Sequence, residues 1–250
     1  MSGSDGSDPR NFLLVHGALH GAWCWEKLVT LLEARGHRVL AIDLPGRGDD
    51  PIRGWRVKFS HCVDRVLDAA VRMDGPVTAV GHSWGGFAIS GAAEAKPIAF
   101  KQLIYLSAFA PRGGDSAASR VARNPKPTVR GSWSNNLLRG ELLPKAADAA
   151  FAFYNTCSHE DQNWAIARLR PEPIRPMLQK ITLTPERFGS VPRAYIRCLQ
   201  DNAISLAAQD QMIEDQAIES VISLDTDHSP FLSAPELCAD ALASASMIHV

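Results

Sequence analysis

The sequence has no apolar run approaching the roughly 20 residues that a membrane-spanning helix needs. Its N-terminus, MSGSDGSDPR, lacks the apolar segment of a secretory signal. The charges nearly cancel, since 26 Lys and Arg stand against 27 Asp and Glu, a formal net charge of −1. Without an excess of either sign, nothing indicates binding to nucleic acid or to an anionic membrane. These absences predict a cytoplasmic protein with neither kind of partner.

Cysteine is scarce and scattered, and no Cys-x-x-Cys pair occurs. The five cysteines are Cys24, Cys62, Cys157, Cys198 and Cys238. An odd number of single cysteines fits reduced thiols better than a disulfide or zinc framework. No cluster of His, Cys, Asp or Glu has metal-ligand spacing, and no glycine-rich loop suits phosphates. The GRG of DLPGRGDD (43–50) lacks a lysine and a following helix, so an ordinary loop is predicted there. We therefore expect no metal and no cofactor.

Hydrophobic residues make up 46% of the 250 residues, enough for a substantial core. Up to residue 110, short apolar strand-like runs alternate with stretches of helical periodicity. The predicted strands are 11–16, 38–45, 77–82 and 102–109, and helices are predicted over 22–35, around 59–70 and after residue 83. Continuous apolar strands separated by helices imply a parallel sheet covered on both faces. The predicted fold class is therefore α/β, with a mostly parallel, doubly wound sheet.

Proline interrupts this alternation between residues 111 and 192, where nine of the sixteen prolines lie. Because proline breaks helices, no long helix is expected there. We predict a cap at 111–191 inserted into a core of 11–110 and 192–250, preceded by a disordered leader at 1–10. The core resumes with strands at 193–199 and 220–225 around a helix at 205–215. The SAPE sequence (233–236) predicts a capping box for the last helix.

A serine stands among glycines at the end of the third predicted strand. Gly81-His82-Ser83-Trp84-Gly85 matches G-x-S-x-G between a strand and a helix, the context in which that pattern marks a nucleophile. The turn is so sharp that neighbouring residues must be small. Ser83 is therefore predicted to be presented at the carboxyl edge of the sheet as a catalytic nucleophile.

A serine hydroxyl needs a base, and the base needs an orienting acid, in the chain order serine, acid, histidine. His228 follows the last predicted strand and is favoured as the base over His159, which lies in the cap. Asp201 directly follows a strand and is the favoured acid. Its rivals, Asp225 and Asp227, stand so close to His228 that they would crowd its loop. They are interpreted as turn residues.

The tetrahedral intermediate needs two N–H donors. One is the backbone of Trp84, after the nucleophile, and the other is Ala18, in the loop after the first strand. His20 and His82 are interpreted as structural, holding loops through hydrogen bonds to the backbone. Together these residues predict acyl transfer.

The chain resembles the α/β-hydrolase group that contains plant hydroxynitrile lyases, plant methylesterases and bacterial carboxylesterases. The resemblance extends over about residues 11–245. It rests on the segments FLLVHGALHGAWCWEKLVTLLEARGHRVLAIDLPGRG, GHSWGG, YLSAFAP, CSHEDQNWAIARLRPEP, LTPERFGSVPRAYI and DTDHSPFLSAPE. The resemblance implies an α/β-hydrolase fold and the same Ser83, Asp201 and His228 triad. It also implies Ala18 and Trp84 as oxyanion donors. Phe109 matches a pocket residue, and further pocket candidates are Leu19, Trp133, Phe153 and Trp164, of which the three aromatics equally fit the core of the cap.

The expected activity is hydrolysis of a hydrophobic small-molecule carboxylic ester, such as a methyl ester or a bulky pyrethroid, and a homodimer is the candidate assembly. The alternatives are a hydroxynitrile lyase or cofactor-free oxygenase with the same triad, and a ligand-sensing receptor with vestigial hydrolysis. In the resembling lyases a threonine and a lysine occupy the positions of Gly17 and Ser229. Gly17 is expected to open space beside Ser83, and the neutral Ser229 offers no charge to a leaving cyanide. Both favour hydrolysis.

Overall fold

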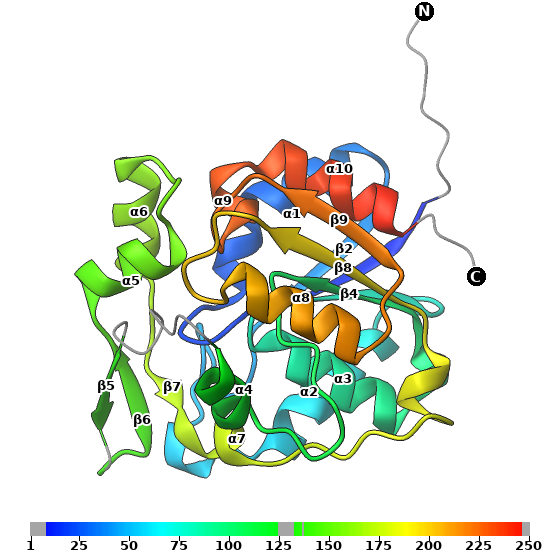
Figure 1. Ribbon diagram of the computed structural model, residues 1–250, viewed down its shortest axis with the longest axis horizontal. Helices are drawn as coiled ribbons and strands as arrows, with labels where there is room; N and C mark the ends of the chain where they lie inside the picture. The colour runs from blue at the N-terminus through cyan, green and yellow to red at the C-terminus, as the bar shows by residue number, and fades with distance from the viewer. Residues whose placement is uncertain (1–8, 125–132, 137, 247–250) are drawn as a thin grey trace, which may run out of the picture.

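A six-stranded sheet forms the centre of the protein, with its strands in the order β2-β1-β3-β4-β8-β9 and every neighbouring pair parallel (Figure 1). The computed structural model describes residues 9–124, 133–136 and 138–246, so residues 1–8 of the predicted leader lie outside it. The strands are β1 (Asn11–Val15), β2 (Arg38–Ile42), β3 (Val77–His82), β4 (Phe100–Leu106), β8 (Arg193–Cys198) and β9 (Ser220–Leu224). The predicted mostly parallel sheet is confirmed.

Helices cover both faces of this sheet. α1 and α10 pack together on one face, and α2, α3 and α8 lie on the other (Figure 1). The helices outside residues 111–191 are α1 (Glu26–Ala34), α2 (Phe59–Val71), α3 (Gly85–Ala95), α8 (Leu206–Asp215), α9 (Pro230–Ser233) and α10 (Pro235–Ala245). Short 3-10 turns are η1 (Ala22–Trp25), η2 (Gly54–Arg56) and η3 (Pro97–Ala99). Every residue of β3 is buried, which explains its mostly apolar sequence. The fold is doubly wound, as predicted.

The direction of winding reverses between β1 and β3. The chain runs from β1 outward to β2, then crosses back to β3 and continues to β4, β8 and β9. β1 and β3 are therefore neighbours, with Val15 opposite Gly81. In open parallel sheets, ligands bind in the crevice where the winding reverses, beyond the carboxyl ends of the strands. The loops after β1 and β3 meet at that point.

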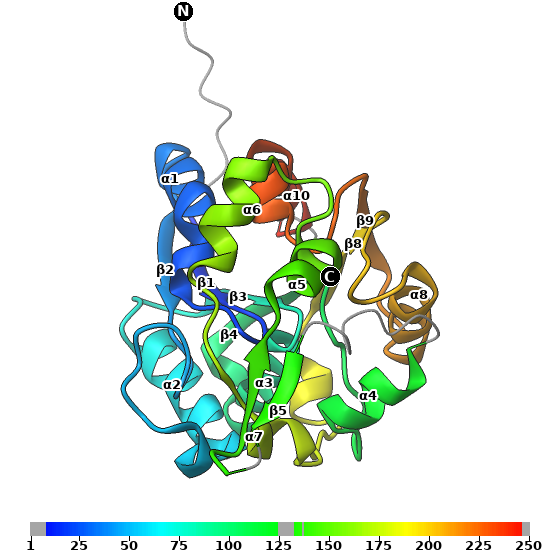
Figure 2. The ribbon, with the colours of Figure 1, turned by 90° about the vertical axis from the view of Figure 1, so that its left-hand side faces the viewer.

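Residues 111–191, which we call the cap segment, form short elements beside the carboxyl edge of the sheet (Figure 2). They comprise α4 (Ala117–Arg123), β5 (Trp133–Asn136), β6 (Glu141–Pro144), α5 (Ala146–Phe153), α6 (His159–Ile166), β7 (Glu172–Pro173), α7 (Ile174–Leu178) and η5 (Phe188–Ser190). β5, β6 and β7 make a small antiparallel sheet. None of the described helices here exceeds eight residues, in keeping with the proline content.

The predicted capping box at SAPE is wrong. α10 begins at Pro235 after Ala234, and no side chain caps it. Ser233 is instead the last residue of the short helix α9, and its hydroxyl donates to Asp227 Oδ1 at 2.8 Å. The box fails because α9 directly precedes α10 and turns the serine toward the loop after β9.

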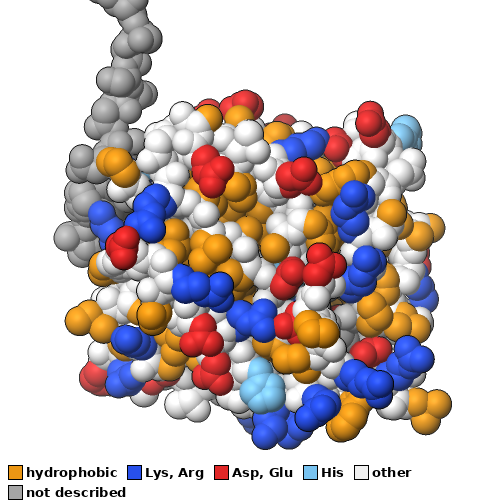
Figure 3. Space-filling view, turned by 180° about the vertical axis from the view of Figure 1, so that it is seen from behind, with side chains coloured by type: hydrophobic (Ala, Val, Ile, Leu, Met, Phe, Trp, Pro, Cys, Tyr) orange, Lys and Arg blue, Asp and Glu red, His pale blue; other side chains and the backbone are white. Residues whose placement is uncertain are grey.

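Acidic and basic side chains are interspersed over the face seen from behind, as a net charge of −1 leads one to expect (Figure 3). Across the described part of the chain, no helix combines the length and apolar character needed to span a bilayer.

Candidate active site

Ser83 stands at a strained turn between β3 and α3. Its φ of 51° lies in the left-handed region, which a residue with a side chain adopts only at a cost. The two glycines that follow leave no room for a side chain. A Cβ on Gly85 would lie 2.5 Å from the carbonyl oxygen of Val15, and one on Gly86 would lie 2.1 Å from that of Phe109. The turn is thus as sharp as G-x-S-x-G predicts, and it lifts Ser83 above the sheet.

His228 and Asp201 form a buried pair beside this turn. His228 Nδ1 lies 2.8 Å from Asp201 Oδ2, and both side chains are shielded from solvent. The other carboxylate oxygen, Oδ1, accepts from the backbone N–H groups of Ala203 at 2.7 Å and Ile204 at 2.8 Å. Since the carboxylate can only accept, Nδ1 of His228 carries a proton and Nε2 is left free to accept one. His228 and Ser83 line the same cavity.

The rival acids lie elsewhere. Asp225 is exposed and binds the side chain of Gln200 at 2.9 Å. Asp227 is fully buried, but its Oδ1 accepts from the backbone of Ser229 at 3.0 Å, which makes it a turn residue as predicted. His159, the alternative base, is exposed at the start of α6.

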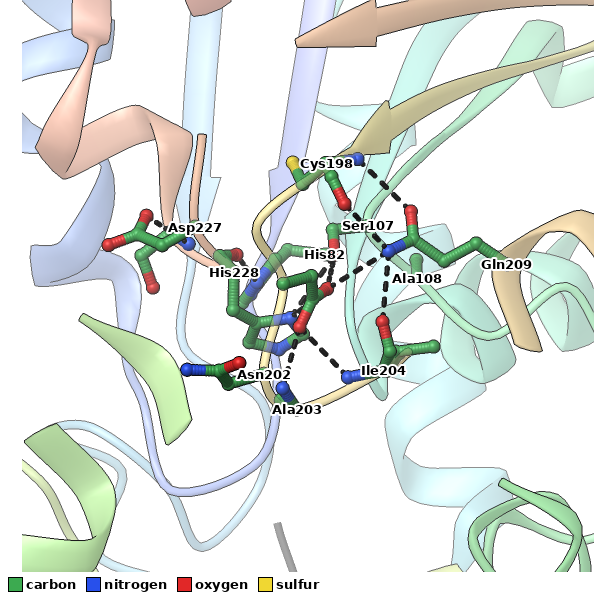
Figure 4. A network of polar contacts seen from close by, with 12 residues as sticks. His82, Ser107, Ala108, Cys198, Asn202, Ala203, Ile204, Gln209, Asp227 and His228 are labelled. Atoms are coloured by element: carbon green, nitrogen blue, oxygen red, sulfur yellow. Dashed lines mark hydrogen bonds and ion pairs between the residues drawn. The ribbon is translucent and has the colours of Figure 1, made fainter. Parts of the chain in front are cut away.

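Sequence reasoning missed two side chains that hold Asp201. Ser107 donates to Asp201 Oδ2 and lies 3.1 Å from His228 Nδ1. Gln209, buried on α8, donates to the same oxygen at 3.3 Å and also binds the backbone of Cys198 (Figure 4). Ser107 has a positive φ of 43° directly after β4, but a serine in YLSAF carries no signal of that role.

The two predicted oxyanion donors flank Ser83. Ala18 lies in the loop after β1 and Trp84 begins the turn into α3, and both line the cavity with Ser83. Within the described ranges, neither backbone N–H donates to a protein acceptor. Such unpaired N–H groups at a helix N-terminus and a neighbouring loop suit a developing negative charge.

Three buried histidines fix the loops around the site. Leu44 N–H donates to His16 Nε2 at 3.0 Å, so the proton on Nδ1 reaches the carbonyl of Gly17 at 2.8 Å. His20 Nδ1 donates to the carbonyl of Ala18 at 2.7 Å and its Nε2 accepts from a tyrosine of the cap segment. His82 Nε2 donates to the backbone of His228 at 2.8 Å. His20 and His82 thus make the hydrogen bonds to the backbone that were predicted for them.

Burial keeps these three histidines neutral. Desolvation lowers the pKa of His16 to about 3 and that of His20 to about 4, although the hydrogen bond of each to a backbone carbonyl partly raises it. Desolvation, with the neighbouring His228 and His20, also places the pKa of His82 well below its usual value. All three therefore stay neutral in the folded protein near neutral pH, each with a single ring proton.

The free energy of unfolding is therefore expected to fall as the pH drops below about 6.5, where unfolded histidines become protonated. The unfolded state then binds more protons than the folded state, which favours unfolding. At about pH 5 each of the three histidines should remove about 2 kcal/mol, a large share of the 5–15 kcal/mol typical of a domain. Urea unfolding curves recorded across this range measure the slope. Most carboxylates remain ionised in this range and so do not offset the effect of the histidines. A free energy of unfolding unchanged from about pH 7 to about pH 5 would therefore contradict the expectation.

The cavity above Ser83 is narrow and apolar. Its volume is about 20 Å³, room for about one water molecule. The predicted pocket residues Phe109, Trp133 and Phe153 line it, whereas Leu19 and Trp164 do not. Trp164 packs against Trp23, with ring centroids 5.3 Å apart. The described lining residues are Ala18, His20, Ser83, Trp84, Phe109, Val121, Trp133, Phe153, Met177, Ala203, Ile204 and His228.

Five lining residues were not anticipated, and one of them is His20, which was interpreted as structural. Ala203 and Ile204 follow Asp201 directly, so their place beside it could have been foreseen from the turn. Val121 of α4 and Met177 of α7 come from the cap segment, where no periodicity shows which side faces the site. No Asp, Glu, Lys or Arg occurs among the described lining residues.

Gly17 does not open space beside Ser83 as expected. A Cβ on Gly17 would lie 2.7 Å from Ser83 Cβ and 3.0 Å from His82 Nδ1. The side chains of Ser83 and His82 already lie where a side chain at Gly17 would go, so the glycine permits close approach of the loop to the serine.

The GRG loop is also more than an ordinary loop. Arg47, its central residue, is fully buried and pairs with Glu172 of β7. All five cysteines are buried and free, and the described residues contain no group of three or more potential metal ligands.

Comparison with known proteins gives consistent matches over nearly the whole chain. The family model described as "Alpha/beta hydrolase family" matches residues 12–241. Methylesterase 2 of Arabidopsis thaliana is 32% identical, covering 93% of this chain and 94% of its own. Putative methylesterase 11, chloroplastic, from the same plant is also 32% identical, and the chain spans 63% of that longer protein. A pyrethroid hydrolase structure from Sphingobium faniae JZ-2 is 28% identical with a TM-score of 0.85, covering 95% of this chain and 97% of its own.

Proposed function

The chain belongs to the alpha/beta hydrolase family, and from that premise we propose that it is a serine carboxylesterase acting on hydrophobic small-molecule esters through an acyl-Ser83 intermediate. The resemblance inferred from the sequence motifs is confirmed. The relatives' names, methylesterase and pyrethroid hydrolase, support ester hydrolysis. The observation that carries the proposal is the buried His228–Asp201 contact beside a strained Ser83 in one apolar cavity.

In this mechanism His228 Nε2 takes the proton of the Ser83 hydroxyl as that oxygen attacks the ester carbonyl. Asp201 holds the imidazole in the required tautomer and stabilises the imidazolium. The N–H groups of Ala18 and Trp84 receive the oxyanion of the tetrahedral intermediate. Collapse of the intermediate releases the alcohol, protonated by His228. Water, activated by the same histidine, then attacks the acyl-serine and frees the acid.

The residue after the base favours hydrolysis over cyanohydrin cleavage. Ser229 is fully buried and neutral, so this position supplies no cation beside His228 to stabilise a departing cyanide. The described lining of the cavity contains no charged side chain of either sign. Such a site suits a neutral ester rather than an anionic leaving group.

The substrate class follows from the same lining. Phe109, Trp133, Phe153, Met177 and Ile204 offer apolar and aromatic surface, which suits a hydrophobic or aromatic acyl or alcohol group. The proposed class includes methyl esters and bulky esters such as pyrethroids, and because the cavity holds only about 20 Å³, a bulky group must displace the side chains that line it.

The free cysteines bear on where the protein is found. All five thiols are free, which favours a reducing compartment, and we propose a cytoplasmic location.

The proposal predicts saturable, multiple-turnover hydrolysis across a panel of methyl, p-nitrophenyl and pyrethroid esters. Rapid mixing with a p-nitrophenyl ester, followed by mass spectrometry, should locate an acyl group on Ser83 where deacylation is the slower step. Mandelonitrile is the comparison substrate. Efficient mandelonitrile cleavage with no ester hydrolysed would establish a lyase instead. Binding of esters with a single turnover at most would establish a receptor.

A further inference from the structure

Arg47 and Glu172 form an ion pair with no exposure to solvent, in a position that the mechanism above does not use. Arg47 Nε lies 2.9 Å from both carboxylate oxygens of Glu172, and a terminal guanidinium nitrogen also binds Oε1. Arg47 belongs to the loop after β2, whereas Glu172 belongs to β7 of the cap segment. The pair therefore joins the cap segment to the core.

Each partner contacts one side of the expected oxyanion hole. Glu172 Oε2 accepts from the backbone N–H of Leu19 at 2.9 Å, and Leu19 directly follows Ala18. The guanidinium of Arg47 lies over the indole of Trp84, 4.4 Å from the ring centroid. The ion pair thus contacts the backbone of Leu19, next to the donor Ala18, and the side chain of the donor Trp84.

Leu19 needs such support because its backbone is strained. Its φ of 66° lies in the left-handed region, which residues with a side chain rarely adopt. The cap segment holds both of its backbone groups, since Arg170 N–H donates to the carbonyl of Leu19 at 2.9 Å while Glu172 accepts from its N–H. Without these contacts the loop is expected to relax, and Ala18 would move with it.

A buried ion pair is in itself a poor source of stability, because removing two charges from water offsets most of their attraction. Burial alone would lower the pKa of Arg47, but the carboxylate of Glu172 raises it above the usual value, so the guanidinium stays charged. Well-packed apolar residues could fill the same volume. The contacts with Leu19 and Trp84 give the charged pair a use that apolar residues could not serve.

We propose that Glu172 positions the oxyanion hole through Leu19, with Arg47, whose guanidinium lies over Trp84, as the counter-ion that holds its carboxylate in place. Glu172 is the positioning residue and Arg47 acts as its counter-ion, and neither side chain lines the cavity with Ser83. The inference rests on the proposed function, since it assumes an oxyanion formed at Ser83.

The test compares two double variants that both remove the buried charges. Arg47→Met with Glu172→Gln keeps an oxygen to accept from Leu19, whereas Arg47→Met with Glu172→Leu does not. Because acylation and deacylation both pass through an oxyanion, kcat should fall whichever step is slower. We expect the glutamine variant to retain kcat within about fivefold and the leucine variant to lose a further ten- to hundredfold, less than removal of a donor itself. The KM should change by less than about twofold in either.

Steady-state kinetics with a p-nitrophenyl ester measure these values, and thermal unfolding confirms that both variants fold. Equal kcat values in the two folded variants would overturn the proposal and leave the pair a structural one. If the leucine variant does not fold, Glu172→Asp in the otherwise unchanged protein replaces it. The shorter carboxylate keeps the charge but withdraws from Leu19, and an unchanged kcat there would equally overturn the proposal. Absence of ester turnover in the unmodified protein would instead refute the proposed function.

Discussion

Replacing Ser83 with alanine is expected to lower kcat for ester hydrolysis by about 10⁶, and replacing His228 with alanine should cost about as much. The two side chains act on one proton, so the loss of either removes the same step. What remains is the weak catalysis supplied by binding and by the N–H groups of Ala18 and Trp84. The measurement is steady-state hydrolysis of the best ester of the panel, with the mass of the protein followed to detect acylation.

Matched controls separate lost chemistry from lost structure. Ser90 is another buried serine, on α3, bonded to the carbonyl of Gly86 and to Tyr105, and Ser90→Ala should retain turnover. His159 is exposed, and His159→Ala should leave kcat unchanged. Thermal unfolding should show Ser83→Ala folded, because only one oxygen atom is removed. Near-normal hydrolysis by folded Ser83→Ala or His228→Ala protein would refute these assignments.

The features that could be predicted from the sequence are those that depend on residues close together in the chain. The glycines around Ser83 report a sharp turn because there is no space for a Cβ at Gly85 or Gly86. The position of Asp201 after a strand could be inferred because parallel strands end at one edge of the sheet. The doubly wound fold could also be predicted, because the spacing of apolar residues that distinguishes strands from helices can be seen in short stretches of sequence.

The sequence was least informative where contacts join distant segments. Glu172 and Arg47 are 125 residues apart, and neither GRG nor RPEP carries a local signal of their meeting. In the cap segment, helices of at most eight residues are too short to define a buried face. Trp164 illustrates this, because it turns to Trp23 and Arg168 rather than to the cavity.

The Asp201→Asn substitution is expected to reduce kcat by about 10⁴, because it selects the wrong tautomer of His228. The N–H groups of Ala203 and Ile204 both point at Oδ1, so an oxygen must stay there. The amide nitrogen of asparagine is then forced into the position of Oδ2, facing His228 Nδ1. A donor at that position makes Nδ1 an acceptor and moves the imidazole proton to Nε2. Nε2 can then no longer take the proton of the serine.

The two neighbouring carboxylates provide the comparison that decides the assignment. Asp225→Asn should leave kcat unchanged, since that side chain is exposed. Asp227→Asn should mainly affect stability, because Asp227 accepts from Ser229 and Ser233 through Oδ1 and from Thr156 through Oδ2. An amide nitrogen facing one of these donors leaves it unpaired, at about 1–3 kcal/mol of unfolding free energy. Kinetics and urea unfolding of all three variants test this order. If Asp227→Asn lost the most kcat while remaining folded, Asp201 would not be the residue that orients the base.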